Sequence, residues 1–238
     1  MVSDLKYNRI LLKLSGEALS GDDKHGIVPE ILNGISAEIK EILDLGVEIA
    51  VVIGAGNFFR GSLGEKLGID RASGDFMGML ATVMNSIALK NSLEKIGVKA
   101  RVLSAIEMKE AAEPYIIDKA RNYLLKGDVV IAAAGTGHPF FTTDTAASLR
   151  AVELKADVLL KATRVDGVYT ADPEKDKFAE KLDAVNYKDI LSNNLRIMDL
   201  TAISLCMENK LPIIVFNLFN RGSLKRIVLG ENVGTFID

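Results

Sequence analysis

The sequence of 238 residues is poor in several features that mark particular classes of protein. It has one cysteine, Cys206, so an internal disulfide is impossible and a cytoplasmic location is expected. No cluster of cysteine and histidine has the spacing of a zinc site, so we expect no metal held by the protein. The longest stretch without a charged side chain, residues 129–143, contains Gly and Pro and is too short to span a bilayer.

Charge bias and several nucleotide motifs are missing as well. The net charge of -3 gives no electrostatic argument for binding nucleic acid or an anionic membrane. The first residues, MVSDLKYNRILLKLSG, have no apolar core of signal-peptide length, so we expect no export. The absence of G-x-x-x-x-G-K-[ST] excludes a P-loop NTPase, and no arrangement of His, Asp and Ser indicates hydrolysis.

The chain instead alternates short apolar runs with longer segments of helical periodicity. Strands are predicted at 9–14, 48–53, 99–104, 128–134, 157–162 and 212–217, and helices at 29–46, 74–97, 118–127, 143–156 and 200–209. Continuous apolar strands separated by helices predict a largely parallel sheet covered on both faces. The expected fold is therefore α/β, a three-layer α/β/α sandwich, in one domain over residues 1–238.

Glycines, hydroxyls and isolated charges follow four of the predicted strands, in SGEAL, GAGNFFRG, GTGHPFFTTD and ATRVDGVYTADP. These loops are expected to converge, because ligands bind outside the carboxyl ends of the strands in such sheets. Gly54 and Gly56 would let the backbone approach a phosphate, although a tight turn is the alternative. Gly61 comes two residues too late for a dinucleotide fingerprint, and Asp75 opens a helix, which disfavours a nicotinamide enzyme.

Isolated cations accompany these glycines. Arg60 offers a rigid donor fork suited to phosphate, although a surface salt bridge is equally compatible with the sequence. Lys13 and Lys161 stand at the ends of two core strands, where each is predicted to reach a polyphosphate. For either lysine alone, the alternative is an edge lysine whose stem lies on apolar surface.

The stretch GTGHPFFTTD, residues 135–144, combines several of these features. Its glycines make room for a ligand, and its last residues start a helix, where free N–H groups accumulate and an acid is favoured. That acid, Asp144, would orient the two lysines without contacting substrate. Phe140 and Phe141 are expected to wall a flat ring, the alternative being a helix cap with two core phenylalanines. His138 is expected to be a loop residue rather than a base.

Six segments carry a resemblance to a known family: KLSGEAL, IGAGNFFRG, GDFMGMLATVMN, AGTGHPFFTTDTAA, KATRVDGVYTADP and IMDLTA. Together they closely resemble the bacterial UMP kinases (uridylate kinases) of the amino-acid kinase superfamily. The similarity covers essentially the whole chain, in order. TADP after VDGV recurs across the superfamily, whereas the third segment and PFFTTD are more specific to the uridylate branch.

The resemblance implies transfer of the γ-phosphoryl of ATP to UMP in pyrimidine nucleotide biosynthesis, with Mg²⁺ carried on the ATP phosphates. It assigns catalysis to Lys13, Arg60, Asp144 and Lys161. It assigns ATP binding to Lys13, Leu14, Ser15, Gly16, Gly56, Arg60, Thr163, Tyr169 and Asp172. It assigns UMP binding to Ala55, Asp75, Thr136, Gly137, His138, Pro139, Phe140, Phe141, Thr142 and Thr143, with Asp75 on the ribose hydroxyls. Ala55 and His138 depart from the glycine and asparagine of many relatives, which casts little doubt on activity.

The resemblance also implies assembly and regulation. A hexamer built from dimers is expected, and the helix at 76–96 carries an apolar excess suited to a subunit contact, with Met77, Leu80, Met84, Ile87, Ala88 and Leu93. UTP is expected to inhibit through the UMP loop. GTP is expected to activate through Gly21, Asp22, Asp23, Lys24, His25, Gly26, Lys90 and Arg101. Glu94 lies beside Lys90 and should weaken that site, because a carboxylate repels a triphosphate.

Two other functions fit parts of the same pattern. One is a superfamily kinase acting on a carboxylate or carbamate, against which Asp75 and PFFTTD argue. The other is a non-catalytic nucleotide-binding or storage protein, against which intact Lys13, Arg60, Asp144 and Lys161 argue.

Overall fold

The computed structural model describes residues 5–23, 25–59, 64, 66–171, 176–192, 195 and 197–238. Its strands are β1 (Arg9–Leu14), β2 (Glu48–Ile53), β3 (Ala100–Ser104), β4 (Glu113–Pro114), β5 (Val129–Ala133), β6 (Val158–Thr163), β7 (Val168–Tyr169), β8 (Lys181–Leu182), β9 (Ala184–Val185), β10 (Ile213–Asn217) and β11 (Thr235–Ile237). Its helices are α1 (Gly16–Ser20), the 3₁₀ turn η1 (Gly21–Asp23), α2 (Pro29–Leu43), α4 (Arg71–Lys95), α5 (Ile117–Leu125), α6 (Thr143–Leu154), α7 (Tyr187–Ser192), α8 (Leu200–Glu208) and α9 (Ser223–Val228).

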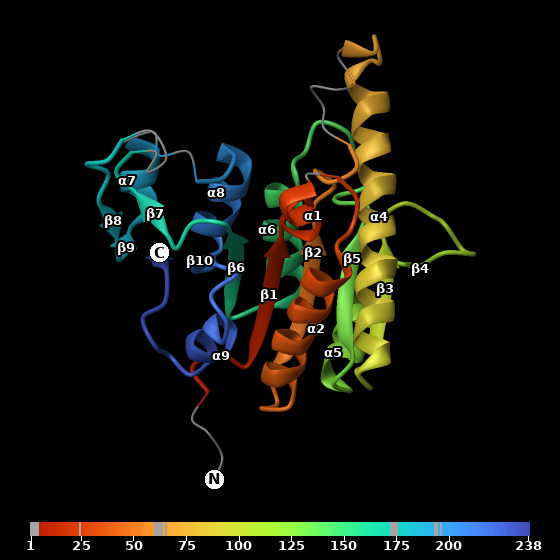
Figure 1. The fold of residues 1–238 in the computed structure, drawn as a ribbon, viewed down its shortest axis with the longest axis horizontal. Coiled ribbons are helices and arrows are strands. Elements are labelled where there is room, and N and C mark those ends of the chain that lie inside the picture. The colour runs from red at the N-terminus through yellow and green to blue at the C-terminus, as the bar shows by residue number, and fades with distance from the viewer. Residues whose placement is uncertain are drawn as a thin grey trace.

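Within these residues, nine strands form one sheet in the order β4-β3-β5-β2-β1-β6-β10-β11-β9, and β7 pairs separately with β8 (Figure 1). Neighbours in the large sheet are parallel except for β10 and β11, which are antiparallel. The predicted largely parallel sheet is therefore confirmed. The strands predicted at 9–14 and 48–53 match β1 and β2 at both ends.

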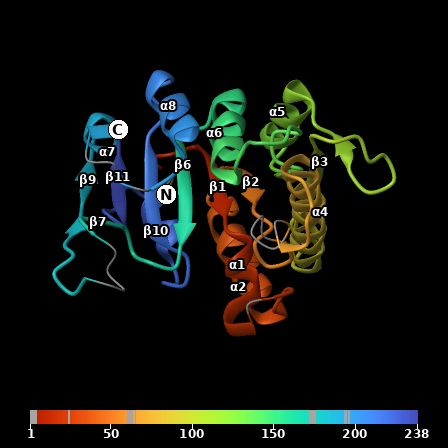
Figure 2. The same cartoon turned by 90° about the horizontal axis from the view of Figure 1, so that it is seen from above.

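Helices cover both faces of the sheet (Figure 2). On one face, α2, α4 and α9 pack Ile39, Leu89 and Ile227 into one hydrophobic cluster with alternate strand residues such as Leu12. On the other face, α5 to α8 form a second cluster with the intervening strand residues, among them Leu11. Because side chains alternate along a strand, a strand covered on both faces must be apolar throughout, which explains the continuous runs.

Local capping fixes where the helices nearest the loops begin. Asp70 precedes α4 and its side chain accepts the N–H of Ser73 at 3.0 Å, so this helix starts three residues before the predicted 74. Thr142 caps α6 by accepting the N–H groups of Asp144 and Thr145, each at 3.1 Å. The N-termini of both helices lie on the side of the sheet to which β1 points (Figure 1), and the start of α6 there meets the loops after β1 and β2.

Candidate active site

Two lysines and one aspartate form a charged group at the carboxyl ends of the central strands. Lys13 and Lys161 are register partners in the β1–β6 ladder, so their side chains share one face of the sheet. Asp144, in the first turn of α6, lies between them, with Oδ1 2.8 Å from Lys13 Nζ and Oδ2 2.7 Å from Lys161 Nζ. The predicted placement of an acid between two lysines is thus observed.

Burial and mutual attraction set the charge of this group. Burial raises the pKa of Asp144, but the positive charges of Lys13 and Lys161 outweigh it, so the pKa lies below its ordinary value. Burial lowers the pKa of Lys161, and the nearby charge of Lys13 adds to this, while Asp144 opposes it. The formal charges of two lysines and one aspartate sum to about +1, which suits an anionic ligand.

The glycine loops after β1 and β2 touch through their backbones. A Cβ on Gly16 would lie 2.6 Å from both the carbonyl oxygen of Gly54 and the nitrogen of Gly56, so no side chain fits there. Gly54 N–H also donates to the carbonyl of Leu14 at 2.9 Å. Ser15, which precedes α1, brings the first loop to this contact. The two loops therefore form one surface lined with peptide groups.

A buried amide pair holds this surface to α4. Asn85 Nδ2 donates to the carbonyl of Gly54 and to Asn57 Oδ1, each at 2.8 Å. Asn57 Nδ2 in turn donates to the carbonyl of Gly26 at 2.8 Å, and both side chains are buried. Both asparagines lie inside motifs that indicated the family, yet their role was not predicted, because it depends on how α4 packs against the loop.

A cavity of about 400 Å³ adjoins the charged group. The described residues that line it are Ala55, Phe59, Arg71, Gly74, Asp75, Gly78, Met79, Thr82, Gly135, Thr136, His138, Phe141, Thr142 and Thr143. Since Thr143 is followed directly by Asp144, the cavity and the lysines share one edge of the sheet.

Asp75 links α4 to the loop after β5 across this cavity. Its carboxylate accepts Arg71 Nε at 3.0 and 2.9 Å and the N–H of Phe140 at 2.7 Å. Arg71, which the sequence reasoning missed, also lies with its guanidinium carbon 6.0 Å from the centroid of the Phe140 ring. An Asp four residues after an Arg at a helix start is a signal from which this pair could have been predicted.

The loop residues predicted to contact UMP divide into two groups. Ala55, Thr136, His138, Phe141, Thr142 and Thr143 line the cavity together with Asp75, whereas Gly137, Pro139 and Phe140 are not among its lining residues. Phe140 is 68% exposed and reaches the loop's outer side, with a positive φ of 72°. Phe141 is therefore the better placed of the two predicted aromatic walls.

A second aspartate, Asp199, reinforces the start of α6 and was not predicted. Its Oδ2 accepts the hydroxyl of Thr142 at 2.5 Å, and its Oδ1 accepts the hydroxyl of Thr145 at 2.8 Å. The same side chain caps α8 by accepting the N–H of Ala202 at 3.0 Å. The helix that carries Asp144 is thus fixed by a neighbouring helix, and IMDLTA contained the residue responsible.

The residues predicted for adenosine follow β6. Thr163 ends that strand, and its hydroxyl donates to the carbonyl of Val165 at 2.6 Å. The hydroxyl of Tyr169 donates to Asp166 Oδ1 at 2.6 Å. The predictions for Arg60, Asp172 and Lys24 concern positions outside the described residues.

The described residues predicted for GTP belong to different parts of the fold, and Gly21, Asp22 and Asp23 line one pocket together. Arg101 points to the α5 face of the sheet, where Nε is 2.9 Å from Asp128 Oδ2 and the guanidinium lies 4.9 Å from the Tyr123 ring centroid. Lys90 belongs to α4 on the opposite face, 3.8 Å from Glu94. The loop after α1 lies on that face too, where Gly26 N–H donates to the carbonyl of Asn57 at 3.0 Å.

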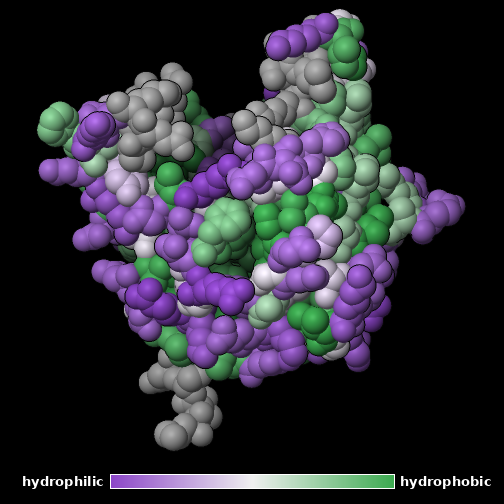
Figure 3. Space-filling view, in the orientation of Figure 1, coloured by the Kyte–Doolittle hydropathy of each residue, from purple (hydrophilic) through white to green (hydrophobic). Residues whose placement is uncertain are grey.

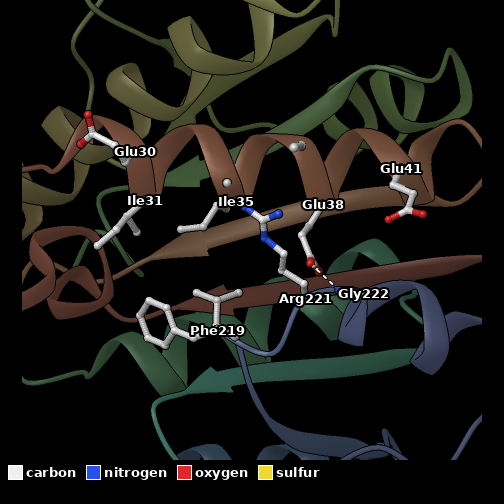
Figure 4. A pocket seen from close by; sticks show the side chains of 11 residues that line it. Glu30, Ile31, Ile35, Glu38, Glu41, Phe219, Arg221 and Gly222 are labelled. Carbon is white, nitrogen blue, oxygen red and sulfur yellow. Dashed lines mark hydrogen bonds between the residues drawn. The ribbon is translucent and has the colours of Figure 1, made fainter.

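A second cavity, of about 420 Å³, lies away from the charged group, between α2 and the loop after β10 (Figure 4). It is lined by Glu30, Ile31, Gly34, Ile35, Ala37, Glu38, Glu41, Leu218, Phe219, Arg221 and Gly222. Glu38 is already bound, because its Oε1 accepts the N–H of Gly222 at 2.6 Å. This cavity contains none of the predicted site residues, so we place the chemistry at the other one.

The outer surface of α4 is apolar, and hydrophobic side chains gather along it on the right of the molecule (Figure 3). Met77, Leu80 and Met84 are 40%, 47% and 53% exposed. Ile87 and Ala88 are partly buried against the core, and Leu93 lies within it. The predicted apolar excess is therefore real but covers only the first part of the helix.

Neither a metal cluster nor a membrane helix occurs in the part of the chain that the structure describes. No three His, Cys, Asp or Glu side chains in this part are grouped so that they hold a metal ion. Among the same residues, every helix falls short of the length and apolarity needed to cross a bilayer.

The chain is similar in sequence and fold to known kinases. A UMP kinase structure from Bacillus anthracis is 42% identical, with a TM-score of 0.95, covering 98% of this chain and 96% of that one. A UMP kinase from Ureaplasma parvum is 33% identical with a TM-score of 0.93, covering 98% and 100%. A uridylate kinase from Archaeoglobus fulgidus is 28% identical with a TM-score of 0.75, covering 96% and 99%. A sequence model of the amino acid kinase family matches residues 8–217, and the chain therefore belongs to that family.

Proposed function

We propose that the protein is a UMP kinase, which transfers the γ-phosphoryl group of ATP to UMP and so produces ADP and UDP. One observation carries the proposal: the group of Lys13, Asp144 and Lys161 adjoins the Asp75 cavity at a single edge of the sheet. The similarity to UMP kinases of Bacillus anthracis and Ureaplasma parvum supports the choice of UMP as acceptor.

The reaction needs positioning and charge more than proton transfer. An oxygen of the UMP phosphate attacks the γ-phosphorus of ATP, and the bond from that phosphorus to the bridging oxygen breaks, leaving its electron pair on ADP. The attacking oxygen is already ionised, so no general base is required. Lys13 and Lys161 would neutralise the negative charge that gathers on the phosphates, and Asp144 would hold both ammonium groups in place.

The residues of the loops are assigned to the other parts of the two nucleotides. We assign the peptide surface of Gly16, Gly54 and Gly56 to the transferred phosphoryl group, since glycines without a Cβ bring these backbone groups close together at the ends of β1 and β2. We assign Asp75 to the ribose hydroxyls, because a carboxylate oxygen has a second lone pair free after accepting from Arg71. Arg60 is assigned to the phosphates, and Thr163, Tyr169 and Asp172 to adenosine.

Magnesium would enter with ATP rather than be held by the protein. Asp144 is poorly suited to a metal ion because both of its oxygens face lysine nitrogens. The phosphate oxygens of ATP supply ligands that Mg²⁺ prefers. The described residues thus do not fit a protein-bound ion, and we derive no step from one.

One experiment separates the proposal from its alternatives. The release of ADP is followed with UMP, CMP, aspartate, glutamate and carbamate as separate acceptors. Turnover with UMP well above the others supports the proposal, whereas preference for a carboxylate or carbamate assigns another kinase reaction. Tight nucleotide binding with no ADP release from any acceptor would indicate a non-catalytic binding protein.

Assembly and regulation complete the proposal. We propose one domain in a cytoplasmic protein, assembled as a hexamer built from dimers through the exposed apolar face of α4. UTP should inhibit in competition with UMP, since its uracil and ribose use the same loop. We propose that a GTP pocket using both Lys90 and Arg101 is completed by a second copy of the chain, since Lys90 belongs to α4 and Arg101 lies against Tyr123 of α5. Initial rates at low UMP, with and without each triphosphate, test both effects.

A further inference from the structure

The chain leaves β5 through a turn that is unfavourable in isolation. Ala134 and Gly135 both adopt positive φ, 60° and 59°, and this conformation is costly for a residue with a Cβ such as Ala134. The turn is closed by Gly137 N–H, which donates to the carbonyl of Ala134 at 2.9 Å. Gly135 and Thr136 line the Asp75 cavity, so the turn determines where that wall stands.

Two side chains hold this turn from opposite faces of the sheet. Thr82 of α4 accepts the N–H of Ala134 at 2.9 Å, while its own hydroxyl donates to the carbonyl of Met79 at 2.6 Å. Arg150 of α6 reaches the turn from the other face, where Nη2 donates to the carbonyl of Gly135 at 3.1 Å. The peptide groups on either side of the Ala134–Gly135 peptide are thus fixed independently of any nucleotide.

Arg150 is itself fixed by a buried cluster behind the loop. Its side chain is only 6% exposed, and Nη1 lies 2.7 Å from Glu153 Oε2. The hydroxyl of Tyr115 donates to the same Oε2 at 2.9 Å, and the Tyr115 ring centroid lies 3.9 Å from the guanidinium carbon of Arg150. Burial raises the pKa of Tyr115, so it remains a donor at neutral pH. A guanidinium held in this way has little freedom to leave Gly135.

We propose that Arg150 is a positioning residue for the acceptor nucleotide, acting through the carbonyl of Gly135. The inference rests on the proposed function, since it assigns the loop to UMP. Arg150 does not occur among the described residues lining the cavity, so its effect must pass through the turn. If Arg150 served only to pack against Glu153 and Tyr115, its loss would not affect one substrate more than the other.

The substitution Arg150→Lys tests the proposal while keeping the charge. A single ammonium lacks the planar fork that serves Glu153 and Gly135 together, so the loop contact should be lost. The KM for UMP should rise about tenfold, the cost of one charge-assisted hydrogen bond, while the KM for ATP stays within about twofold. Hydrogen exchange without nucleotide should become faster at the amides of residues 136–138, 140 and 141. Arg150→Gln, which removes the buried charge, serves as a second variant with the same expectation.

Tyr115→Phe is the matched control, because it removes one hydrogen bond from the cluster and leaves the contact with Gly135 in place. It should lower the melting temperature without changing the KM for UMP or exchange in the loop. An unchanged UMP KM and unchanged exchange in both Arg150 variants would overturn the proposal, as would equal increases in both KM values. Exchange is measured without substrate, so it tests Arg150 even if the wild-type protein fails to phosphorylate UMP.

Discussion

Replacing Asp144 by Asn removes the negative charge that lies between Lys13 and Lys161. The three side chains are 12–15% exposed, so the two ammonium groups would face each other with little water to screen them. Removing one partner of a buried ion pair costs about 3–5 kcal/mol, and we expect about 2–3 kcal/mol here because Asn still accepts a hydrogen bond. For a domain of this size, that lowers Tm by roughly 4–12 °C. The value of kcat should fall about 100-fold as the lysines lose their orientation.

The pH dependence of stability gives a more specific test of the contribution that the Asp144 carboxylate makes. The pKa of Asp144 is lowered in the folded protein, so its stabilising effect is complete above the ordinary value of 3.8. It is lost as pH falls through the lower, folded-state pKa. The difference in unfolding free energy between wild type and Asp144→Asn should therefore be constant near neutral pH and shrink below about 3.8.

Asp157→Asn is the matched control for this variant. Asp157 lies at the opposite end of the same strands, where Oδ2 accepts the N–H groups of Asn8 and Arg9 at 2.7 and 2.9 Å. Its substitution should reduce stability but leave kcat within about twofold, because backbone hydrogen bonds far from the phosphates do not act on the reaction. Denaturant unfolding and the rate of ADP release measure the two effects. Wild-type turnover in Asp144→Asn with an unchanged Tm would refute the reasoning.

Three further changes probe the acceptor site, the assembly and the effector. Wild-type enzyme should prefer UMP to dUMP by roughly ten- to a hundredfold in kcat/KM. The substitution Asp75→Asn should reduce that preference. Equal kcat/KM values for the two nucleotides in wild type would show that Asp75 does not bind the ribose hydroxyls. Leu80→Arg should reduce the mass seen in sedimentation, whereas Leu125→Arg, at an even more exposed site on α5, should not. Glu94→Arg should strengthen activation by GTP, measured at low UMP, and no gain would mean that this carboxylate faces away from the effector.

Much of the fold could be predicted from the sequence because local signals agree with the tertiary structure. The apolar runs of β1 and β2 have sharp ends, and both were located to the residue. The helix that follows β5 ends at Leu154, two residues before its predicted end, because Lys155 leaves it in a left-handed conformation that usually signals glycine. The two-residue strands β4, β7, β8 and β9 were missed, since so short a pairing depends on neighbours distant in sequence.

The candidate site likewise contains some residues that could be predicted from the sequence and others that could not. Lys13, Asp144 and Lys161 could be singled out because charged residues at the ends of core strands are unusual, and the structure brings them into contact. Their separate roles in catalysis remain predictions. The contacts of Arg150 and Asp199 could not be predicted, because both depend on which helices become neighbours on one face of the sheet. Arg150 has no local pattern that distinguishes it from an ordinary helix residue, and the position of Asp199 before α8 indicates a helix cap but not its contacts with α6.

The sheet order has a consequence for how the chain matures during synthesis. β1 is among the first elements to be made, yet one of its two neighbours is β6, which emerges only after β2, β3, β4 and β5. Until then β1 presents an open apolar edge, a state that favours wrong pairing between chains. When β6 docks, it closes this edge and brings Lys161 beside Lys13 in the same step. A nascent chain thus brings Lys13 and Lys161 together only as it closes this edge of β1.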